Sequence, residues 1–151
     1  MADDELTPGA PNGMPSDQEL RSILGQARTI AVVGLSSDPK RPSHRVAAYL
    51  KAKGYRVVPV NPQEQEVLGE RSYSSLRDVP SDVQIDVVDV FRRPEATPEI
   101  AADAVAVGAK VLWLQTGIVN EEAARIGEEG GLDVVMGICI HDTSERLEEA
   151  S

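Results

Sequence analysis

Short apolar runs alternate along this chain with longer segments in which apolar residues recur every three or four positions. The apolar runs span residues 29–33, 56–60, 85–90, 110–114 and 133–136, and each has the length of a buried strand. The longer segments predict helices near Leu20 to Leu24, over 43–53, from Pro94 or Pro98 to Val107, and from Asn120 to residue 129. Strands that alternate with such helices form parallel βαβ units. We therefore expect a single three-layer α/β domain with a five-stranded, mostly parallel sheet in the order 3-2-1-4-5.

Glycine, proline and capping residues indicate where these elements begin and end. Ser16 or Asp17 and later Asn120 suit a helix N-terminus, while Gly54 and Gly108 suit a helix end. The apolar residues of segment 63–80 follow no clear helical or strand spacing. We expect a turn at 66–69 and a one-turn helix at 74–79. Residues 1–15 hold three prolines and two glycines without an apolar period, which predicts a disordered arm. The predicted domain covers 16–142, and 143–151 is expected to be a polar tail whose short helix frays.

Charge and composition narrow the classes of partner. The chain has 151 residues, enough for one domain with its own core, and a formal net charge of −10. A strongly acidic protein is repelled by nucleic acid and by anionic membranes, and no apolar run approaches the roughly 18 residues of a membrane helix. The N-terminus lacks the basic start of a signal peptide, and the single cysteine, Cys139, fits a reducing compartment. We expect a cytoplasmic protein that binds neither nucleic acid nor membrane.

The polar motifs of the chain follow the predicted strands, so a parallel sheet brings them to one edge. The first of these loops, Gly34 to Ser43, breaks a buried strand at a glycine and leads into a helix. Helix N-termini bind anions, and Lys40, Arg41 and Arg45 place three cations beside this one in an otherwise acidic chain. In the expected strand order, the loops after the first and fourth strands flank the ligand crevice. This pattern predicts a seat for a phosphorylated ligand.

Two common nucleotide-binding fingerprints are absent from the sequence. After the first strand the chain reads Gly34–Leu35–Ser36–Ser37–Asp38–Pro39, with one glycine where a dinucleotide site needs G-x-G-x-x-G. The second strand ends at Pro59–Val60–Asn61–Pro62, which offers no acidic residue to a ribose diol. No segment matches the P-loop pattern, so ATP hydrolysis is not expected. Both absences count against NAD and ATP as ligands.

Four segments taken together resemble the small bacterial and archaeal CoA-binding proteins, whose fold is similar to the N-terminal domain of the succinyl-CoA synthetase alpha subunit. The segments are AVVGLSSDPKRPSHRVAAYL, GYRVVPVNP, VFRRPE and LWLQTGI, and the resemblance runs from roughly Leu20 to Cys139. It implies a Rossmann-like domain that holds CoA by its phosphates and adenine at the loops after strands one to four. The chain departs from the family pattern where Gly137 and Ile138 replace charged residues before Cys139.

Carried onto this chain residue by residue, the resemblance implies a set of ligand contacts. CoA bears a pyrophosphate and a 3′-phosphate, which need several cations and N–H donors, whereas its adenine needs only an apolar slot. The implied contacts are Gly34, Leu35 and Ser36 in the first phosphate loop; Lys40, Arg41, Ser43 and Arg45 at the phosphates; Val60, Asn61 and Pro62 on the nucleotide side; Phe91 and Arg92 closing over the ligand; and Gln115 and Gly117 from the fourth strand.

Several motif residues also have a purely structural interpretation. Arg92 and Arg93 can be solvated side chains, although an arginine at a helix start opposes the macrodipole, which favours a ligand role. Asn61 before a proline suits a turn as well as a ligand contact. Trp113 lies inside a predicted strand, so we expect it in the core rather than stacked on a base.

The sequence holds no constellation that predicts catalysis. His44 and His141 have no evident partner set for a catalytic dyad, and Asp86 and Asp89 lack metal-ligand spacing, so we expect no metal. Cys139 follows the fifth strand and is either a buried thiol or one that exchanges with the CoA thiol to form a mixed disulfide.

These observations predict a non-catalytic protein that binds CoA or acyl-CoA. Related ligases need a further domain and subunit, which 151 residues do not hold, while a homodimer and an unidentified protein partner stay open. One alternative is a small NAD(P)-dependent or nucleotide-sugar-using enzyme, in which Lys40 and Arg41 recognise a nucleotide phosphate. Another is a regulatory module whose affinity depends on acyl chain length.

Overall fold

Five parallel strands form the central sheet of the computed structural model, which describes residues 14–150. They are β1 (Thr29–Val33), β2 (Arg56–Val60), β5 (Val87–Val90), β6 (Val111–Leu114) and β7 (Asp133–Met136). Every residue of β1, β5 and β6 is buried, which explains why these strands read as continuous apolar runs rather than as alternating patterns. The predicted α/β class and the parallel five-stranded sheet are confirmed.

The order of the strands differs from the predicted one. The sheet runs β2-β1-β5-β6-β7, or 2-1-3-4-5 when these five strands are numbered alone, whereas the sequence predicted 3-2-1-4-5. The third of these strands, β5, pairs with β1 and β6 and is covered on both sides. The outer edge of β2 is taken instead by the chain around Tyr73, whose N–H donates to Pro59 and whose carbonyl accepts from Asn61. A fully buried strand such as β5 needs two strand neighbours, which the predicted edge position would deny it.

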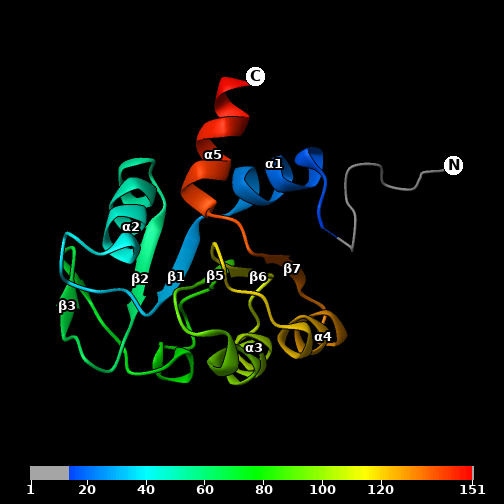
Figure 1. Cartoon of the computed structure of the whole chain (residues 1–151). Helices are drawn as coiled ribbons and strands as arrows, with labels where there is room; N and C mark the ends of the chain where they lie inside the picture. Colours follow the sequence, from blue (N-terminus) through cyan, green and yellow to red (C-terminus); the bar gives the residue numbers. More distant parts are fainter. Residues whose placement is uncertain (1–13, 151) are drawn as a thin grey trace, which may run out of the picture.

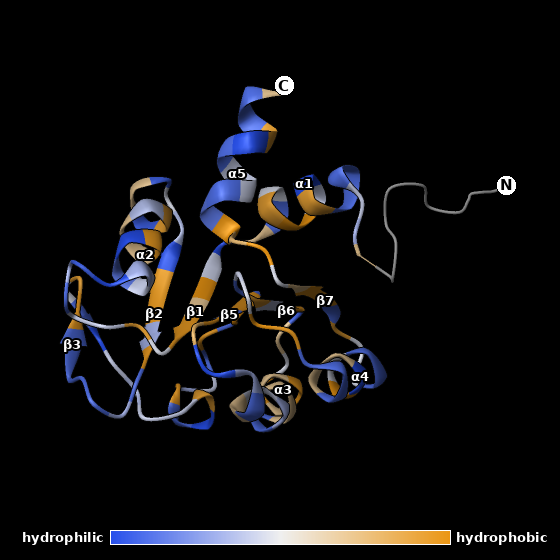
Figure 2. Ribbon diagram, in the orientation of Figure 1, coloured by the Kyte–Doolittle hydropathy of each residue, from blue (hydrophilic) through white to orange (hydrophobic). Residues whose placement is uncertain are grey.

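The helices cover the two faces of the sheet unequally. Helices α1 (Asp17–Gln26), α2 (Pro42–Ala52) and α5 (Ile140–Glu149) lie on one face, and α3 (Thr97–Ala106) and α4 (Glu121–Glu129) lie on the other (Figure 1). Apolar residues line the strands and the helix sides that meet them (Figure 2). Alternate strand residues enter the two cores, so Trp113 packs beneath α1, α2 and α5 while its neighbour Leu112 packs toward α3 and α4.

Most predicted helix ends are confirmed. Ser16 forms a capping box with Glu19, and the Asn120 side chain accepts the Ala123 N–H at 2.8 Å. Gly54 follows α2 with a φ of +103°, a backbone conformation that favours glycine. The predicted turn at 66–69 joins two short antiparallel strands, β3 (Glu66–Val67) and β4 (Glu70–Arg71), and the one-turn helix is a 3₁₀ turn at Leu76–Asp78.

The C-terminal segment packs more firmly than the sequence predicted. Helix α5 runs from Ile140 to Glu149, and Ile140 and Leu147 are buried in the same core as α1 and α2. The Tyr49 hydroxyl on α2 lies 2.9 Å from the Ser144 hydroxyl, and Arg146 pairs with Asp17 of α1 at 3.0 Å. The sequence analysis expected a fraying tail because most residues of this segment are polar, and only one stripe of the helix is buried. The predicted disordered arm falls almost wholly on residues 1–13, which lie outside the described residues.

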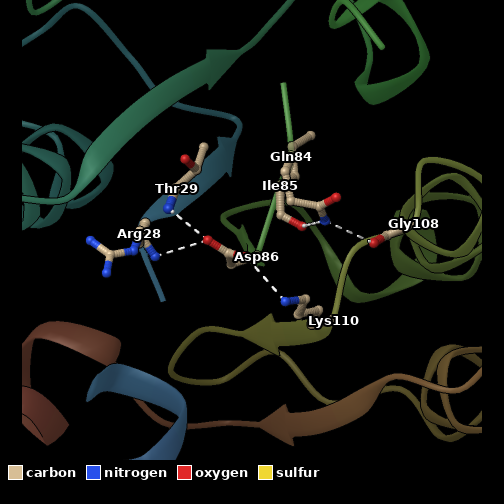
Figure 3. A network of polar contacts seen from close by, with 7 residues as sticks. All are labelled: Arg28, Thr29, Gln84, Ile85, Asp86, Gly108 and Lys110. Atoms are coloured by element: carbon tan, nitrogen blue, oxygen red, sulfur yellow. Dashed lines mark hydrogen bonds and ion pairs between the residues drawn. The ribbon is translucent and has the colours of Figure 1, made fainter. Parts of the chain in front are cut away.

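A polar network centred on Asp86 ties together the N-terminal edge of the sheet, opposite the polar loops (Figure 3). One carboxylate oxygen of Asp86 accepts the backbone N–H groups of Arg28 and Thr29 at 2.8 and 3.0 Å, and the other lies 3.9 Å from Lys110 Nζ. Asp86 is therefore a structural link between β1, β5 and β6. Within residues 14–150, no group of three acidic, histidine or cysteine side chains is placed to hold a metal, and no helix is long and apolar enough to cross a membrane.

Candidate functional site

The loops after β1 and β5 meet at the C-terminal edge of the sheet. The chain leaves β1 toward β2 on one side and then returns to β5 on the other, so the direction of winding reverses between β1 and β5. Ligands bind open sheets at such a switch point. The crevice therefore lies between the loops after the first and third strands, not the first and fourth as the predicted order required.

Gly34 brings the two loops into contact. Its φ is +90°, its N–H donates to the Val60 carbonyl at 2.8 Å, and a Cβ built at this position would lie 2.5 Å from the Phe91 carbonyl oxygen. The Arg92 side chain comes within 3.1 Å of the same point. Only glycine combines this conformation with so close an approach of a second strand end.

The loop from Gly34 to Ser43 is folded by its own side chains. The Ser43 hydroxyl is buried and accepts the Ser36 N–H at 3.1 Å, while the Ser36 hydroxyl accepts the Asp38 N–H at 3.0 Å. Leu35 is fully buried in the core beneath α2 and lines neither hollow, so it does not offer the direct ligand contact that the sequence predicted. The predicted phosphate loop is thus a preformed structure in which Leu35 serves as an anchor.

Four cations surround this loop without acidic partners. Lys40, Arg41, Arg45 and Arg92 are exposed, and none of them forms an ion pair among the residues that the structure describes. Arg45 donates only to the Lys40 carbonyl, at 2.9 Å. Their placement concentrates positive charge at one edge of an acidic protein.

The N-terminus of α2 lies among these cations and has no capping side chain. Arg41 occupies the N-cap position without a side-chain bond to the first turn, and that turn contains no acidic residue. By contrast, α1 and α4 each have a side-chain cap and acidic residues in their first turns. Cations at a helix N-terminus are repelled by the positive end of the macrodipole, and an uncapped first turn leaves its N–H groups without acceptors. An anion bound there relieves both costs.

Two hollows open on either side of the contact between Gly34 and Phe91. The smaller, of about 180 Å³, lies against α3; we name it the α3-side hollow, and Val60, Pro62 and Arg92 line it together with Ser74, Ser75 and Ile100. The larger, of about 530 Å³, lies between α2 and the start of α5; we name it the α5-side hollow, and Arg45, Phe91 and Gln115 line it together with Val46, Ile118 and Cys139.

Three predicted contact residues have evident structural tasks. The Asn61 side chain donates to the Leu35 carbonyl at 3.0 Å and accepts the Gln63 N–H at 2.9 Å, which joins the first two loops. Gln115 is buried and accepts the Ile140 N–H at 3.1 Å, so it satisfies the first turn of α5. Gly117 is exposed with a φ of +78° and lines neither hollow.

The structure adds residues that the sequence prediction did not include. The Glu64 carboxylate accepts the Ser37 N–H of the first loop at 2.9 Å, and His141 on α5 stacks on Tyr49 with ring centroids 3.7 Å apart. His141 also lines the α5-side hollow. Glu64 had no sequence signal, because it lies in the irregular segment after β2 whose path depends on tertiary contacts.

Asp89 lies beneath this site, at the third position of β5. Its carboxyl group is fully buried, has no hydrogen-bond partner among the described residues, and has its pKa raised well above the usual range because burial disfavours the charged form. Phe91, two residues later on the same side of the strand, lines the α5-side hollow. Trp113, the register partner of Asp89, is fully buried, which confirms its predicted place in the core.

Comparison with known proteins connects this geometry to one family. A family model described as a CoA binding domain matches residues 28–141. YneT, a Bacillus subtilis protein described as uncharacterized, is 44% identical over 126 residues, which are 83% of this chain and 92% of YneT. Among solved structures, a hypothetical protein from Pyrococcus horikoshii has a TM-score of 0.86 at 39% identity, covering 96% of this chain and 99% of that one.

A larger enzyme contains a similar segment. The alpha subunit of the ADP-forming acetate–CoA ligase II of Pyrococcus furiosus is 41% identical over 104 residues, which are 68% of this chain and 23% of that subunit. The chain thus spans less than a quarter of the ligase subunit, and the similarity concerns that part alone.

Proposed function

This chain belongs to the family of CoA-binding domains, and from that premise we propose that it binds coenzyme A at the C-terminal edge of its sheet. One observation carries the proposal: Lys40, Arg41, Arg45 and Arg92 have no ion pair among the described residues, although the chain has a net charge of −10. Unpaired cations around an uncapped helix N-terminus suit a ligand with several phosphates.

The two hollows suit the remaining parts of CoA. In our proposal the pyrophosphate lies over Gly34 and the N-terminus of α2, and the adenosine occupies the α3-side hollow. Val60, Pro62 and Ile100 supply an apolar lining there, with Arg92 at its edge. The pantetheine arm then runs into the α5-side hollow, which Arg45 and Phe91 border. This placement follows the order of groups along CoA, from adenosine through pyrophosphate to pantetheine.

We further propose that the protein holds CoA without transforming it. YneT, with which the chain shares most of its length, contains no large additional segment, whereas the ligase subunit extends far beyond the matched part. Incubation with acetyl-CoA should release no free thiol above the buffer rate, as followed by a thiol-reactive dye. Release that depends on protein concentration would show a thioesterase or transferase instead.

Calorimetric titration tests the binding proposal directly. We expect CoA to bind more tightly than dephospho-CoA, because removal of the 3′-phosphate leaves cations unpaired, and to bind less tightly at high salt. The double variant Lys40→Ala/Arg41→Ala should weaken CoA binding by roughly 100-fold, about 1.4 kcal/mol for each charge-assisted contact.

A matched control separates local contacts from net charge. Arg56→Ala/Arg125→Ala removes the same charge from the far end of β2 and from α4, and should leave CoA affinity within about twofold. NAD and acetyl-CoA are titrated in parallel. Binding of NAD in place of CoA would support the nucleotide-dependent enzyme, and equal losses in both double variants would contradict a phosphate seat at α2.

A further inference from the structure

Cys139 lies where the proposed ligand would end. It occupies the N-cap position of α5, is half-buried, and lines the α5-side hollow with Phe91 and Ile118. Pro42 and Arg45, from the first turns of α2, line the same hollow. A nucleotide seated at that N-terminus therefore has its arm at the entrance of a hollow that contains the protein's single thiol.

Two side chains from the end of β6 hold the backbone on both sides of Cys139. The Trp113 indole N–H donates to the Ile138 carbonyl at 2.9 Å, and the Gln115 Oε1 accepts the Ile140 N–H at 3.1 Å. These bonds position Cys139 at the wall of the hollow rather than leaving it on a mobile loop.

Gln115 also supplies an independent sign of a ligand in the hollow. The residue is only 4% exposed and lines the hollow, and its Oε1 is taken by Ile140. Its Nε2 donates to no residue among 14–150 and is not fully enclosed, so this amide N–H is available to a ligand in the hollow. The pantetheine arm carries two amide carbonyls that can accept such a bond.

We propose that Cys139 is a site of thiol–disulfide exchange with CoA disulfide, an inference that rests on the proposed CoA site. The Cys139 thiolate attacks one sulfur of CoA disulfide, a bond forms between Sγ and that sulfur, and the original S–S bond breaks. One CoA leaves as a thiolate and takes up a proton from solvent. The number of disulfide bonds is unchanged, and the second CoA stays linked to Cys139 in its own binding site.

The adduct has no internal route of release. The chain contains no second cysteine, so only a thiol from outside the protein can reduce the mixed disulfide. The bound nucleotide fills the site while the link persists, so the redox state of the CoA pool would set how much protein is free to exchange its ligand.

Intact-mass spectrometry tests the exchange on the full-length protein. Reduced protein is incubated with CoA disulfide or with glutathione disulfide, whose primary thiol leaves similarly but carries no nucleotide. We expect a mass gain of one CoA less two hydrogens, one from each thiol, which dithiothreitol reverses. This adduct should form at least about tenfold faster than the glutathione adduct, because binding raises the local concentration of the disulfide. The Lys40→Ala/Arg41→Ala variant should lose this advantage while its reaction with iodoacetamide stays at the wild-type rate.

The outcomes separate this inference from the proposed function. Cys139→Ser and Cys139→Ala should form no adduct yet retain CoA binding by calorimetry, and the wild-type rates remain informative if either variant fails to fold. Equal rates with the two disulfides, a disulfide-linked dimer, or no adduct in a protein that binds CoA would overturn the exchange alone. Failure of the wild type to bind CoA by calorimetry would overturn the proposed function and the exchange together.

Discussion

Asp89 allows a direct test of how a buried carboxyl group couples stability to pH. Burial raises its pKa well above the usual range, and no described residue donates a hydrogen bond to it. An unfolded aspartate has a pKa near 3.9, so above about pH 4 the folded protein keeps a proton that the unfolded chain has lost. The free energy of unfolding contributed by this group therefore falls as pH rises, until the pH exceeds the folded-state pKa.

The magnitude follows from the linkage of one proton. Between the two pKa values the loss is about 1.4 kcal/mol for each pH unit. Asp89→Asn keeps the shape of the side chain and removes the titration, so the stability of the variant relative to wild type should rise by that amount per pH unit. Asparagine also leaves a buried amide without partners, which costs a constant amount at every pH and does not change the slope.

Urea unfolding followed by Trp113 fluorescence provides the assay, because this is the protein's single tryptophan and it pairs with Asp89 across the sheet. Unfolding free energies of the two ligand-free proteins are compared at about pH 4.5, 5.5 and 6.5. The exposed Asp82→Asn is the control, and its difference from wild type should not follow this slope. A constant difference between Asp89→Asn and wild type across the range would refute the reasoning.

Two further predictions concern the first loop. Gly34→Ala should lower the free energy of unfolding in urea by about 3 kcal/mol or more, because strain at φ +90° adds to a clash with the Phe91 carbonyl. The control Gly54→Ala, at φ +103° with open space around its Cβ, should lower it by only about 1 kcal/mol. Equal losses of unfolding free energy in the two variants would mean that the loop at Phe91 shifts to accommodate the added methyl group. Glu64→Gln should tighten CoA binding about fivefold in calorimetry, because it removes a negative charge from beside Ser37 N–H while keeping an acceptor, and unchanged affinity would place the phosphates elsewhere.

The sequence located most of the elements because their signals are local. Ser16 and Asn120 were predicted as N-caps and Gly54 as a left-handed helix end. The structure confirms all three roles. Helix α5 was underestimated, since its buried stripe includes Thr143 and Ser144, polar residues that become core only by packing against α1 and α2.

The candidate site was predicted in part, for a related reason. Glycine and clustered cations after the first strand indicate an anion seat, and Gly34, Lys40, Arg41 and Arg45 do meet at one edge. That the same edge gathers Glu64, His141 and Cys139 depends on residues far apart in the chain. No local pattern encodes such distances.

The amino-acid sequence by itself determined the parallel α/β class, the apolar strands, the helix ends and a cation-rich loop, because propensity, capping and hydrophobic period act over a few residues. Tertiary structure alone decided that β5 pairs with β1, which placed the crevice between the loops that begin at Gly34 and Phe91. It also left Asp89 buried without a partner and anchored Cys139 between Trp113 and Gln115. Strand order depends on which packing buries the most apolar surface, and that is a property of the whole chain.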